Sequence, residues 1–253
     1  MRLTVLGRWS PYAPPGGACV GYLLEAGTAR LLLDCGSGVV AALLRWIEAA
    51  DLSAMVITHL HPDHFSDVYA LANARRFGRW PDPPAPPLPV FAPRAAADHL
   101  AAALPRPEAQ ADLRERFDFR PLEEGSGAIG TVRLRFAPTS HPMPCHAVEV
   151  AAGGRRLVYT ADTGPSPEVE ALARGADLLL AEATLLADTE HLAATLGHLS
   201  GRLAGAMAAR AGARRLLLTH FFTPHHDVKE SVAAAAKECG AVSAVDDGAT
   251  YEV

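Results

Sequence analysis

The sequence lacks the features that mark a membrane-spanning or secreted protein. No uncharged apolar run reaches the roughly 18 residues that are needed to span a bilayer. Only 4 of the 253 residues are cysteine, and none of them form a CxxC pair, so we expect free thiols and no disulfide framework. The N-terminal residues lack the long apolar core and small-residue cleavage site of a secretory signal, and we therefore expect a cytoplasmic protein.

Positive charge is also scarce. Lysine and arginine together number 23 against 28 aspartates and glutamates, which gives a net charge of −5. The only lysines are Lys229 and Lys237. Nonspecific electrostatic binding of nucleic acid over the whole surface is therefore not expected, although a local basic patch is not excluded.

What is present is the composition of an ordinary folded protein. Apolar residues make up 49% and charged residues 20% of the chain, and the length suffices for a buried core. Hairpin-like segments fill the first part of the chain, and alternating helix and strand patterns follow from Pro167. This mixture predicts a single domain over residues 1–253 of mixed α/β (α+β) class, in which two packed sheets carry helices outside them.

Two proline-rich segments are predicted to lie outside the sheets. The stretch Trp9 to Gly17 holds three prolines and two glycines, so we expect a loop there. Pro81 to Pro89 holds six prolines in nine positions and is predicted to be an extended surface connector, unsuited to a central strand. Loops such as these are expected to set substrate specificity.

The sharpest signal is a cluster of metal-ligating side chains directly after an apolar strand predicted at Ala54 to Thr58. His59, His61, Asp63 and His64 lie within six residues. A loop at a strand end can direct alternate side chains to one point, and the start of the next helix fixes the last two. Imidazole and carboxylate groups are typical ligands of zinc and related divalent ions. The cluster therefore predicts a metal site.

Three later residues have a similar setting. His141, Asp162 and His220 each follow the end of a predicted strand. Taken singly, such a residue is often only a structural polar group. Together with the first cluster they supply five histidines and two aspartates, which suffice for two metals that share one bridging carboxylate.

These residues resemble the metal motifs of the metallo-β-lactamase superfamily, in the same order and spacing over nearly the whole chain. The resemblance implies a four-layer αββα sandwich with the site at one edge, between the sheets. It implies two divalent metals, zinc or alternatively manganese. The implied ligands of one metal are His59, His61 and His141, those of the other are Asp63, His64 and His220, and Asp162 is the implied bridge.

A second pair of motifs is similar to the HEAT and HST elements of the ribonuclease Z-like branch. They are the segments Ala181 to Thr184 and Gly197 to Ser200. Ala181 replaces the first histidine of HEAT, and the residues after the HST histidine also differ. Glu182 and His198 are retained, and in that branch such a pair lies beside the phosphate. The resemblance implies that His198 donates to a phosphoryl oxygen or protonates the leaving alkoxide, while Glu182 orients it.

One part of that branch is missing. Processing ribonucleases carry an inserted arm that grips tRNA, whereas His141 to Asp162 here has room for only a short hairpin. We therefore expect an armless phosphodiesterase that uses a two-metal-activated hydroxide, with no membrane and no large RNA as partner. Its substrate would be a small cyclic or nucleotide phosphodiester or a short oligonucleotide. Asp63 is the expected proton acceptor for the attacking water.

Four alternatives stay open at this point. They are a ribonuclease Z-type tRNA 3′ endonuclease, a thioester or lactone hydrolase, an iron-dependent oxidoreductase on the same scaffold, and a binding protein with a degenerate site. The Glu182 and His198 pair disfavours the thioester and lactone branches, and the complete ligand set disfavours a degenerate site. Relatives of this branch often dimerise, so a homodimer is also considered.

The remaining candidate residues are given supporting roles. The resemblance implies that Asp34 supports the histidine motif without binding a metal directly, and Thr58 is placed with it. Cys145 is interpreted as a small packing residue. A third metal site at His225 and His226 is disfavoured, because both follow His220 on a predicted surface loop.

Overall fold

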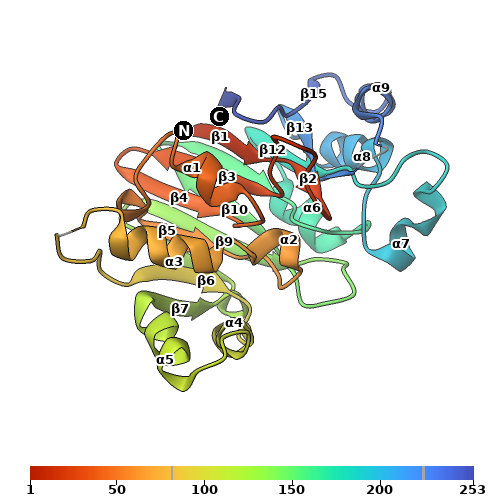
Figure 1. Ribbon diagram of the computed structural model, residues 1–253. Coiled ribbons are helices and arrows are strands. Elements are labelled where there is room, and N and C mark those ends of the chain that lie inside the picture. Colours follow the sequence, from red (N-terminus) through yellow and green to blue (C-terminus); the bar gives the residue numbers. More distant parts are fainter. Residues whose placement is uncertain (81, 224–225) are drawn as a thin grey trace.

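The computed structural model describes residues 1–80, 82–223 and 226–253. Two large β-sheets pack face to face, and helices cover the outer face of each (Figure 1). This arrangement confirms the predicted mixed α/β class and the αββα sandwich.

The first sheet combines antiparallel and parallel strands. In their order across the sheet they are β16 (Thr250–Glu252), β1 (Arg2–Gly7), β3 (Gly21–Ala26), β4 (Ala29–Leu33), β5 (Ala54–Val56), β6 (Leu88–Ala92) and β7 (Phe117–Pro121). Strands β3 and β4 form a hairpin in which Tyr22 lies opposite Leu33. From β4 onward the strands are parallel, so β4 and β5 both end at the same edge of the sheet.

The second sheet repeats this plan. In order its strands are β15 (Val242–Ala244), β13 (Leu216–Thr219), β12 (Leu178–Glu182), β11 (Arg155–Tyr159), β10 (His146–Ala152), β9 (Val132–Pro138) and β8 (Ser126–Ile129). The β10–β11 hairpin occupies the interval between His141 and Asp162, as the short spacing predicts. Strand β9 runs parallel to β11, and β11, β12 and β13 are parallel neighbours. The carboxyl ends of these four strands therefore meet at one edge.

Most of the helices divide between the two outer faces, while α7 lies apart from the sheets (Figure 1). Those of the first half are α1 (Val39–Leu43), α2 (Pro62–Phe65), α3 (Val68–Phe77), α4 (Ala96–Ala102) and α5 (Pro107–Arg116). Those of the second half are α6 (Pro167–Ala173), α7 (Ala193–Leu196), α8 (Gly201–Ala211) and α9 (Val228–Ala236). Single 3₁₀ turns lie at η1 (Ala49–Asp51), η2 (Leu122–Glu124) and η3 (Glu190–Leu192). None of the helices in the described ranges is long and apolar enough to cross a membrane.

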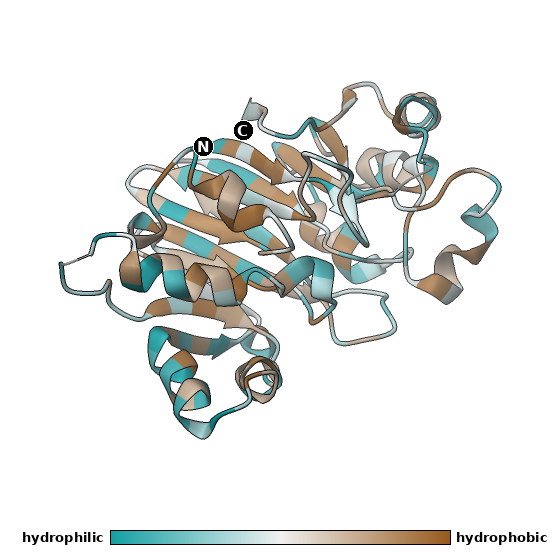
Figure 2. Ribbon diagram, in the orientation of Figure 1, coloured by the Kyte–Doolittle hydropathy of each residue, from teal (hydrophilic) through white to brown (hydrophobic). Residues whose placement is uncertain are grey.

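The strands are apolar on both faces because each sheet is covered twice. In β4, Leu31 and Leu33 enter the core between the sheets, while Leu32 packs under the helices. In β12, Leu180 faces the inner core and Leu179 the outer one. Figure 2 shows this as predominantly hydrophobic strands surrounded by more hydrophilic helix surfaces and loops.

The proline-rich segments do not behave entirely as predicted. Trp9 and Ser10 form strand β2, which pairs in parallel with β14 (Phe221–Phe222), so the prediction of an unbroken loop over Trp9–Gly17 is wrong at its start. Leu88 and Pro89 belong to β6, which lies between β5 and β7. The connector prediction is therefore wrong for its last two described residues, because strand pairing with β7 begins at Leu88. Pro81 lies outside the described residues.

Candidate metal centre

The predicted ligands come from the loops at the shared edge of the two sheets. Strand β5 ends at Val56, and the chain then passes through His59 and His61 into the short helix α2. Pro62 is its first residue, a position where a proline costs no hydrogen bond. Asp63 and His64 follow in the same turn and are buried.

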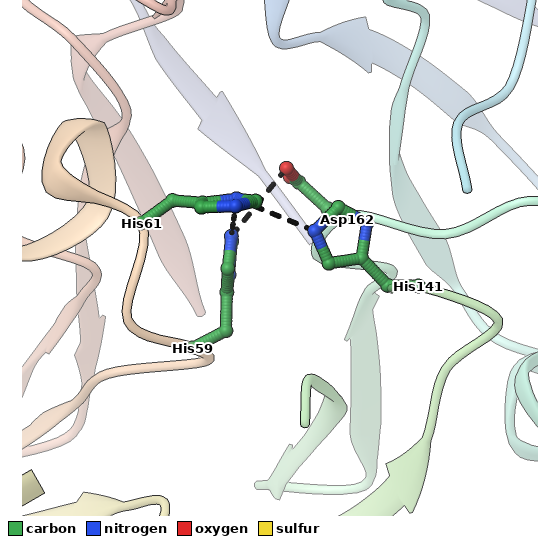
Figure 3. Close-up of side chains that lie close together, drawn as sticks. All are labelled: His59, His61, His141 and Asp162. Atoms are coloured by element: carbon green, nitrogen blue, oxygen red, sulfur yellow. Dashed lines mark hydrogen bonds and ion pairs between the residues drawn. The ribbon is translucent and has the colours of Figure 1, made fainter. Parts of the chain in front are cut away.

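Three histidines converge to form the first group (Figure 3). His61 Nδ1 lies 2.9 Å from His59 Nε2 and 3.3 Å from His141 Nε2. His59 and His61 belong to the loop after β5, whereas His141 belongs to the loop after β9 in the other sheet. The group therefore joins the two halves of the sandwich.

A second group lies beside the first and contains Asp63, His64 and His220. His64 Nε2 and His220 Nε2 are 3.1 Å apart, and each lies 3.7 Å from Asp63 Oδ2. His220 directly follows β13, so this group also takes residues from both sheets.

Asp162 lies between the two groups. Its Oδ2 is 3.6 Å from His59 Nε2, while its Oδ1 is 3.1 Å from His220 Nε2 and 3.4 Å from His64 Nε2. Oδ1 is buried and has no hydrogen-bond donor among the described residues. A buried carboxylate oxygen without a donor is costly unless a cation compensates it. This orphaned atom fits a metal that Asp162 would share between both groups.

The hydrogen bonds of the outward-facing ring nitrogens show which nitrogen of each histidine is free to bind a metal. His64 Nδ1 lies 2.8 Å from the carboxylate of Asp34 and must carry the proton, because a carboxylate only accepts. His220 Nδ1 faces Thr184 Oγ1 at 2.8 Å, and this hydroxyl already donates to Glu182. In both rings Nδ1 therefore carries a proton, which leaves Nε2 as the nitrogen that can bind a metal.

The first group follows the same rule. His141 Nδ1 donates to the carbonyl oxygen of Gly197 at 3.1 Å. His59 Nδ1 faces Thr58 Oγ1 at 3.1 Å, and that hydroxyl donates to Asp34 at 3.0 Å. The Nε2 atoms of His59 and His141 thus carry lone pairs, and both face His61 Nδ1. Tetrahedral zinc with bonds of about 2.0–2.1 Å would separate neighbouring nitrogens by about 3.4 Å, close to the spacing found here.

The local charges favour a cation at this point. Burial opposes charge on His64, yet Asp162 and Asp34 raise its pKa well above the usual value. Burial lowers the pKa of His59, and the other imidazoles add to this effect. Burial alone would raise the pKa of Asp162, but His220, His64 and His59 hold it well below its usual range. Without a metal the two carboxylates thus favour a second proton on His64, and a divalent cation bound by the imidazoles and the ionised Asp162 would displace that proton.

Asp34 is the buried support of this arrangement. Its Oδ1 accepts from the backbone N–H of Thr58 at 2.8 Å, and its Oδ2 accepts from Thr58, His64 and the Tyr159 hydroxyl, the last at 2.9 Å. This contact set agrees with the supporting role implied for Asp34 and Thr58. Tyr159 is an additional partner that the sequence analysis missed, because it lies 125 positions away in the other sheet.

The backbone is strained where the ligands emerge. Asp34, Ala161 and His220 have positive φ values of 57°, 51° and 57°. Each lies just past the end of β4, β11 or β13, respectively. Left-handed geometry in residues other than glycine costs about 1–2 kcal/mol each and persists where the surrounding structure enforces it.

His198 and Glu182 form a pair beside the second group. His198 Nδ1 donates to Glu182 Oε1 at 3.0 Å, and the same oxygen accepts from the backbone N–H of Thr163 at 2.7 Å. The His198 ring stacks on His220 with 5.7 Å between ring centroids. Burial opposes charge on His198, but Glu182 raises its pKa to about 9, so the ring carries a second proton at neutral pH.

Asp63 has a partner that the sequence did not reveal. Ser10 Oγ donates to Asp63 Oδ2 at 2.8 Å across 53 positions. Burial would raise the pKa of Asp63, but His220 and His64 hold it below its usual range, so the carboxyl is ionised. The sequence around Ser10 gives no sign of this contact, because the position of Ser10 depends on the pairing of β2 with the distant strand β14.

A cavity of about 640 Å³ opens over these side chains. Its polar floor includes Asp63, Asp162 and His198, and its wall is largely apolar. The wall contains Pro11, Leu185, Leu186, Leu196 and Phe222. Such a combination of a few convergent polar groups with an apolar wall is typical of small-molecule sites.

The structure brings all seven predicted ligands and the pair of Glu182 and His198 together at one place. Buried Cys145 donates its thiol to the backbone oxygen of Asp162 at 3.4 Å, in keeping with a packing role. His226 lines the cavity, and its Nε2 faces Ser231 Oγ at 2.8 Å. His225 lies outside the described residues.

Comparison with known protein sequences shows the family to which the chain belongs. The family model for the beta-lactamase superfamily domain matches residues 29–221. The probable metallo-hydrolase YhfI of Bacillus subtilis is 31% identical over the full length of both chains. A ribonuclease Z of Mycolicibacterium paratuberculosis is 33% identical, with 87% of this chain and 86% of that protein covered.

Solved structures agree on the fold. The crystal structure of YhfI superposes with a TM-score of 0.87 at 26% identity, over 99% of this chain and 98% of the other. The short form of human tRNase Z superposes with a TM-score of 0.79 at 22% identity, over 100% and 99% of the two chains.

Proposed function

This chain belongs to the beta-lactamase superfamily, and from that premise we propose that it is a phosphodiesterase that uses two divalent cations, zinc in preference to manganese. The proposed substrate is a small cyclic or nucleotide-type phosphodiester or a short oligonucleotide. His59, His61 and His141 would hold one cation, Asp63, His64 and His220 the other, and Asp162 would bridge them.

The observation that supports phosphoryl chemistry most directly is the protonated His198 at the edge of the metal centre. Glu182 raises the pKa of His198 to about 9, against the opposing effect of burial, and accepts the Nδ1 proton. The Nε2 proton is then available to an anionic oxygen in the cavity that His198 lines. A phosphoryl oxygen or a leaving alkoxide is such a partner, and protonating the leaving group is general acid catalysis.

The remaining residues divide the work of the reaction. When bound, the two cations would supply an activated water and neutralise the charge that develops on the phosphoryl oxygens. Asp63, ionised and held by Ser10, would orient that water and accept its proton. His198 would donate its Nε2 proton to the departing oxygen, while Glu182 stabilises the imidazolium that precedes the transfer.

A ribonuclease Z-type tRNA 3′ endonuclease is the second candidate, favoured by the relative that is 33% identical. Two observations disfavour this candidate. The short β10–β11 hairpin occupies the interval in which that branch carries its tRNA-binding arm. The described lining of the cavity contains no lysine or arginine. A thioester or lactone hydrolase would have no evident use for the pair of buried Glu182 and half-buried His198. An iron-dependent oxidoreductase would be identified by metal content and colour.

Three further expectations stay predictions: a single domain over residues 1–253, a cytoplasmic location and assembly as a homodimer.

The test compares leaving groups in the metal-loaded protein and in a His198→Ala variant. We expect the wild-type protein to hydrolyse bis-p-nitrophenyl phosphate and a cyclic nucleotide, and to leave a thioester and a precursor tRNA uncleaved. His198→Ala should lower kcat by roughly 10²-fold for the cyclic nucleotide, whose alkoxide leaving group needs a proton. The loss should be smaller for the p-nitrophenyl ester, whose leaving group departs unprotonated. Metal content should stay unchanged.

Other outcomes have distinct meanings. Equal losses for both substrates would assign His198 to phosphate binding and not to proton transfer. Activity on the thioester alone would overturn the phosphodiesterase proposal, and efficient cleavage of the precursor tRNA would favour the second candidate.

A further inference from the structure

Two large apolar side chains lie exposed on the wall of the candidate active-site cavity. Phe222 and Leu196 are 49% and 43% exposed, and both line the cavity. Most large apolar side chains of the described residues are buried in the three cores. An exposed apolar pair at a cavity therefore calls for an explanation in terms of what the cavity binds.

Phe222 is fixed by the small parallel sheet. It pairs with Ser10 in the register of β14 and β2. The backbone N–H groups on either side of Phe222, those of Phe221 and Thr223, donate to the oxygens of Arg8 and Ser10 at 2.9 and 2.7 Å. Because Ser10 also binds Asp63, the Phe222 ring is held on the side of the cavity that adjoins Asp63.

Leu196 is fixed by a tight turn next to His198, and it also lines the cavity. It ends α7, and Gly197 follows with a φ of +70°. A Cβ atom at Gly197 would lie 2.7 Å from Pro142 and 2.9 Å from His141 and Ser140, so the turn packs directly against the His141 loop. Leu196 is thus placed two residues from the proton donor, on the side where a leaving group would depart.

The charges of the cavity limit what else can bind. Its described lining contains no lysine or arginine, while Asp188 adds a carboxylate at the wall. A second phosphate beyond the metal centre would find no guanidinium or ammonium partner there, and proteins that bind several phosphates rely on such partners. The wall instead offers apolar contact area.

We propose that Phe222 and Leu196 form an apolar clamp that selects ligands with a single phosphoryl group carrying uncharged aromatic or apolar substituents. Phe222 would contact one substituent and Leu196 the leaving group. This inference rests on the proposed function and narrows its substrate from oligonucleotides to small diesters with one phosphate. Contact between an aromatic ligand group and an aromatic side chain predicts a preference of about tenfold or more.

Binding can be measured without turnover by calorimetry on the metal-loaded protein. The probes are methylphosphonate, phenylphosphonate and a thymidine trinucleotide. We expect phenylphosphonate to bind about tenfold more tightly than methylphosphonate, and the trinucleotide to gain nothing from its additional phosphates. The single phenyl group can occupy the position of either substituent, so Phe222→Ala and Leu196→Ala should each weaken this preference. The double variant should abolish the preference, because neither position then offers the apolar contact. Phe77→Ala is the matched control, since Phe77 on α3 is 51% exposed but lies outside the cavity lining.

Two results would overturn the clamp: an undiminished phenyl preference in the double variant, or tighter binding of the trinucleotide than of phenylphosphonate. Failure of the proposed function has a different signature. In that case the phenyl preference would be present and sensitive to Phe222, yet no phosphodiester would be hydrolysed. Conversely, hydrolysis without any phenyl preference would reject the clamp and retain the phosphodiesterase.

Discussion

At the scale of single residues, the decisive feature is the set of hydrogen bonds on the outer side of four candidate ligand rings, those of His59, His64, His141 and His220. Asp34, Thr184 and the carbonyl group of Gly197 each fix a proton on the nitrogen that faces away from the centre, directly or through a hydroxyl. The inward lone pairs are then available together. Partners of this kind orient ligands and raise their basicity.

Asp34→Asn should therefore weaken metal binding. The amide removes a negative charge and can no longer accept on both atoms, so the Nδ1 proton of His64 loses its partner. We expect the affinity for zinc to fall about 10–100-fold, measured by competition with a chelating dye. Tyr159→Phe removes one donor but keeps the carboxylate, so its loss should be smaller. An unchanged affinity in Asp34→Asn would show that Asp34 does not set the protonation of His64.

Glu182→Gln should change the pH dependence of catalysis. The carboxylate raises the pKa of His198 to about 9, so the proton-donating form predominates below that pH and is lost above it. Without the charge the pKa falls, and the alkaline limb of the kcat profile for a cyclic nucleotide should move to lower pH. Glu190→Gln serves as control, because Glu190 binds Ser200 and Arg202 and leaves His198 alone. A limb that stays in place would contradict the assignment of His198 as the acid.

At the scale of elements, the ends of strands and helices decide where the side chains go. Gly197 ends α7 and Gly212 ends α8, both with left-handed backbone. Only Gly197 packs closely, against the loop that carries His141, while a Cβ at Gly212 would meet nothing within 4 Å. Substitutions at the two positions therefore distinguish the cost of backbone strain from the cost of a steric clash.

Gly197→Ala should accordingly cost more than Gly212→Ala. The backbone conformation alone predicts a loss of about 1–2 kcal/mol for the Gly212 variant, with normal activity. The clash at Gly197 adds to that loss and displaces both His141 and His198, so turnover should also fall. Urea denaturation and kcat measure the two effects, and similar results for both variants would mean that the turn adapts without moving the site.

The elements also show what the sequence can predict. The cluster from His59 to His64 is recognisable because its members lie within one strand end and one helix turn. The role of Ser10 cannot be recognised from the sequence, because its partner Asp63 lies 53 positions away. Strand β2, which holds Ser10, forms through pairing with β14. Pro89 was expected in a connector because proline lacks an N–H group, yet pairing with β7 includes it in β6. Local patterns predict the residues that gather at the candidate metal centre, and long-range pairing decides which groups support them.

At the scale of the whole molecule, the candidate ligands connect the two sheets. Each group takes histidines from both halves, and Tyr22 and Tyr159 add hydrogen bonds to Thr219 and Asp34 at 2.6 and 2.9 Å across the interface. Without a cation, the inward nitrogens of the candidate ligand rings crowd against one another. The folded state should therefore depend on metal.

Removal of metal by a chelator should lower the melting temperature. A ligand that binds only the folded state adds about 2.7 kcal/mol at a concentration of 100 times its Kd. Calorimetry of the zinc-loaded and chelator-treated protein measures the shift. His220→Ala should reduce it, and His198→Ala should leave it intact, since we place His198 outside the ligand set. Equal melting temperatures with and without zinc would argue against a metal site that joins the sheets.

The cavity wall and the buried support of the ligands are built from separate parts of the chain. Phe222 and Leu196 belong to short peripheral segments, whereas Asp34, Thr58 and Tyr159 lie inside the sandwich. Replacing these two apolar side chains therefore leaves the hydrogen bonds of Asp34, Thr58 and Tyr159 in place. This separation would let the cavity wall change its ligand preference while the candidate metal centre keeps its hydrogen-bonded support.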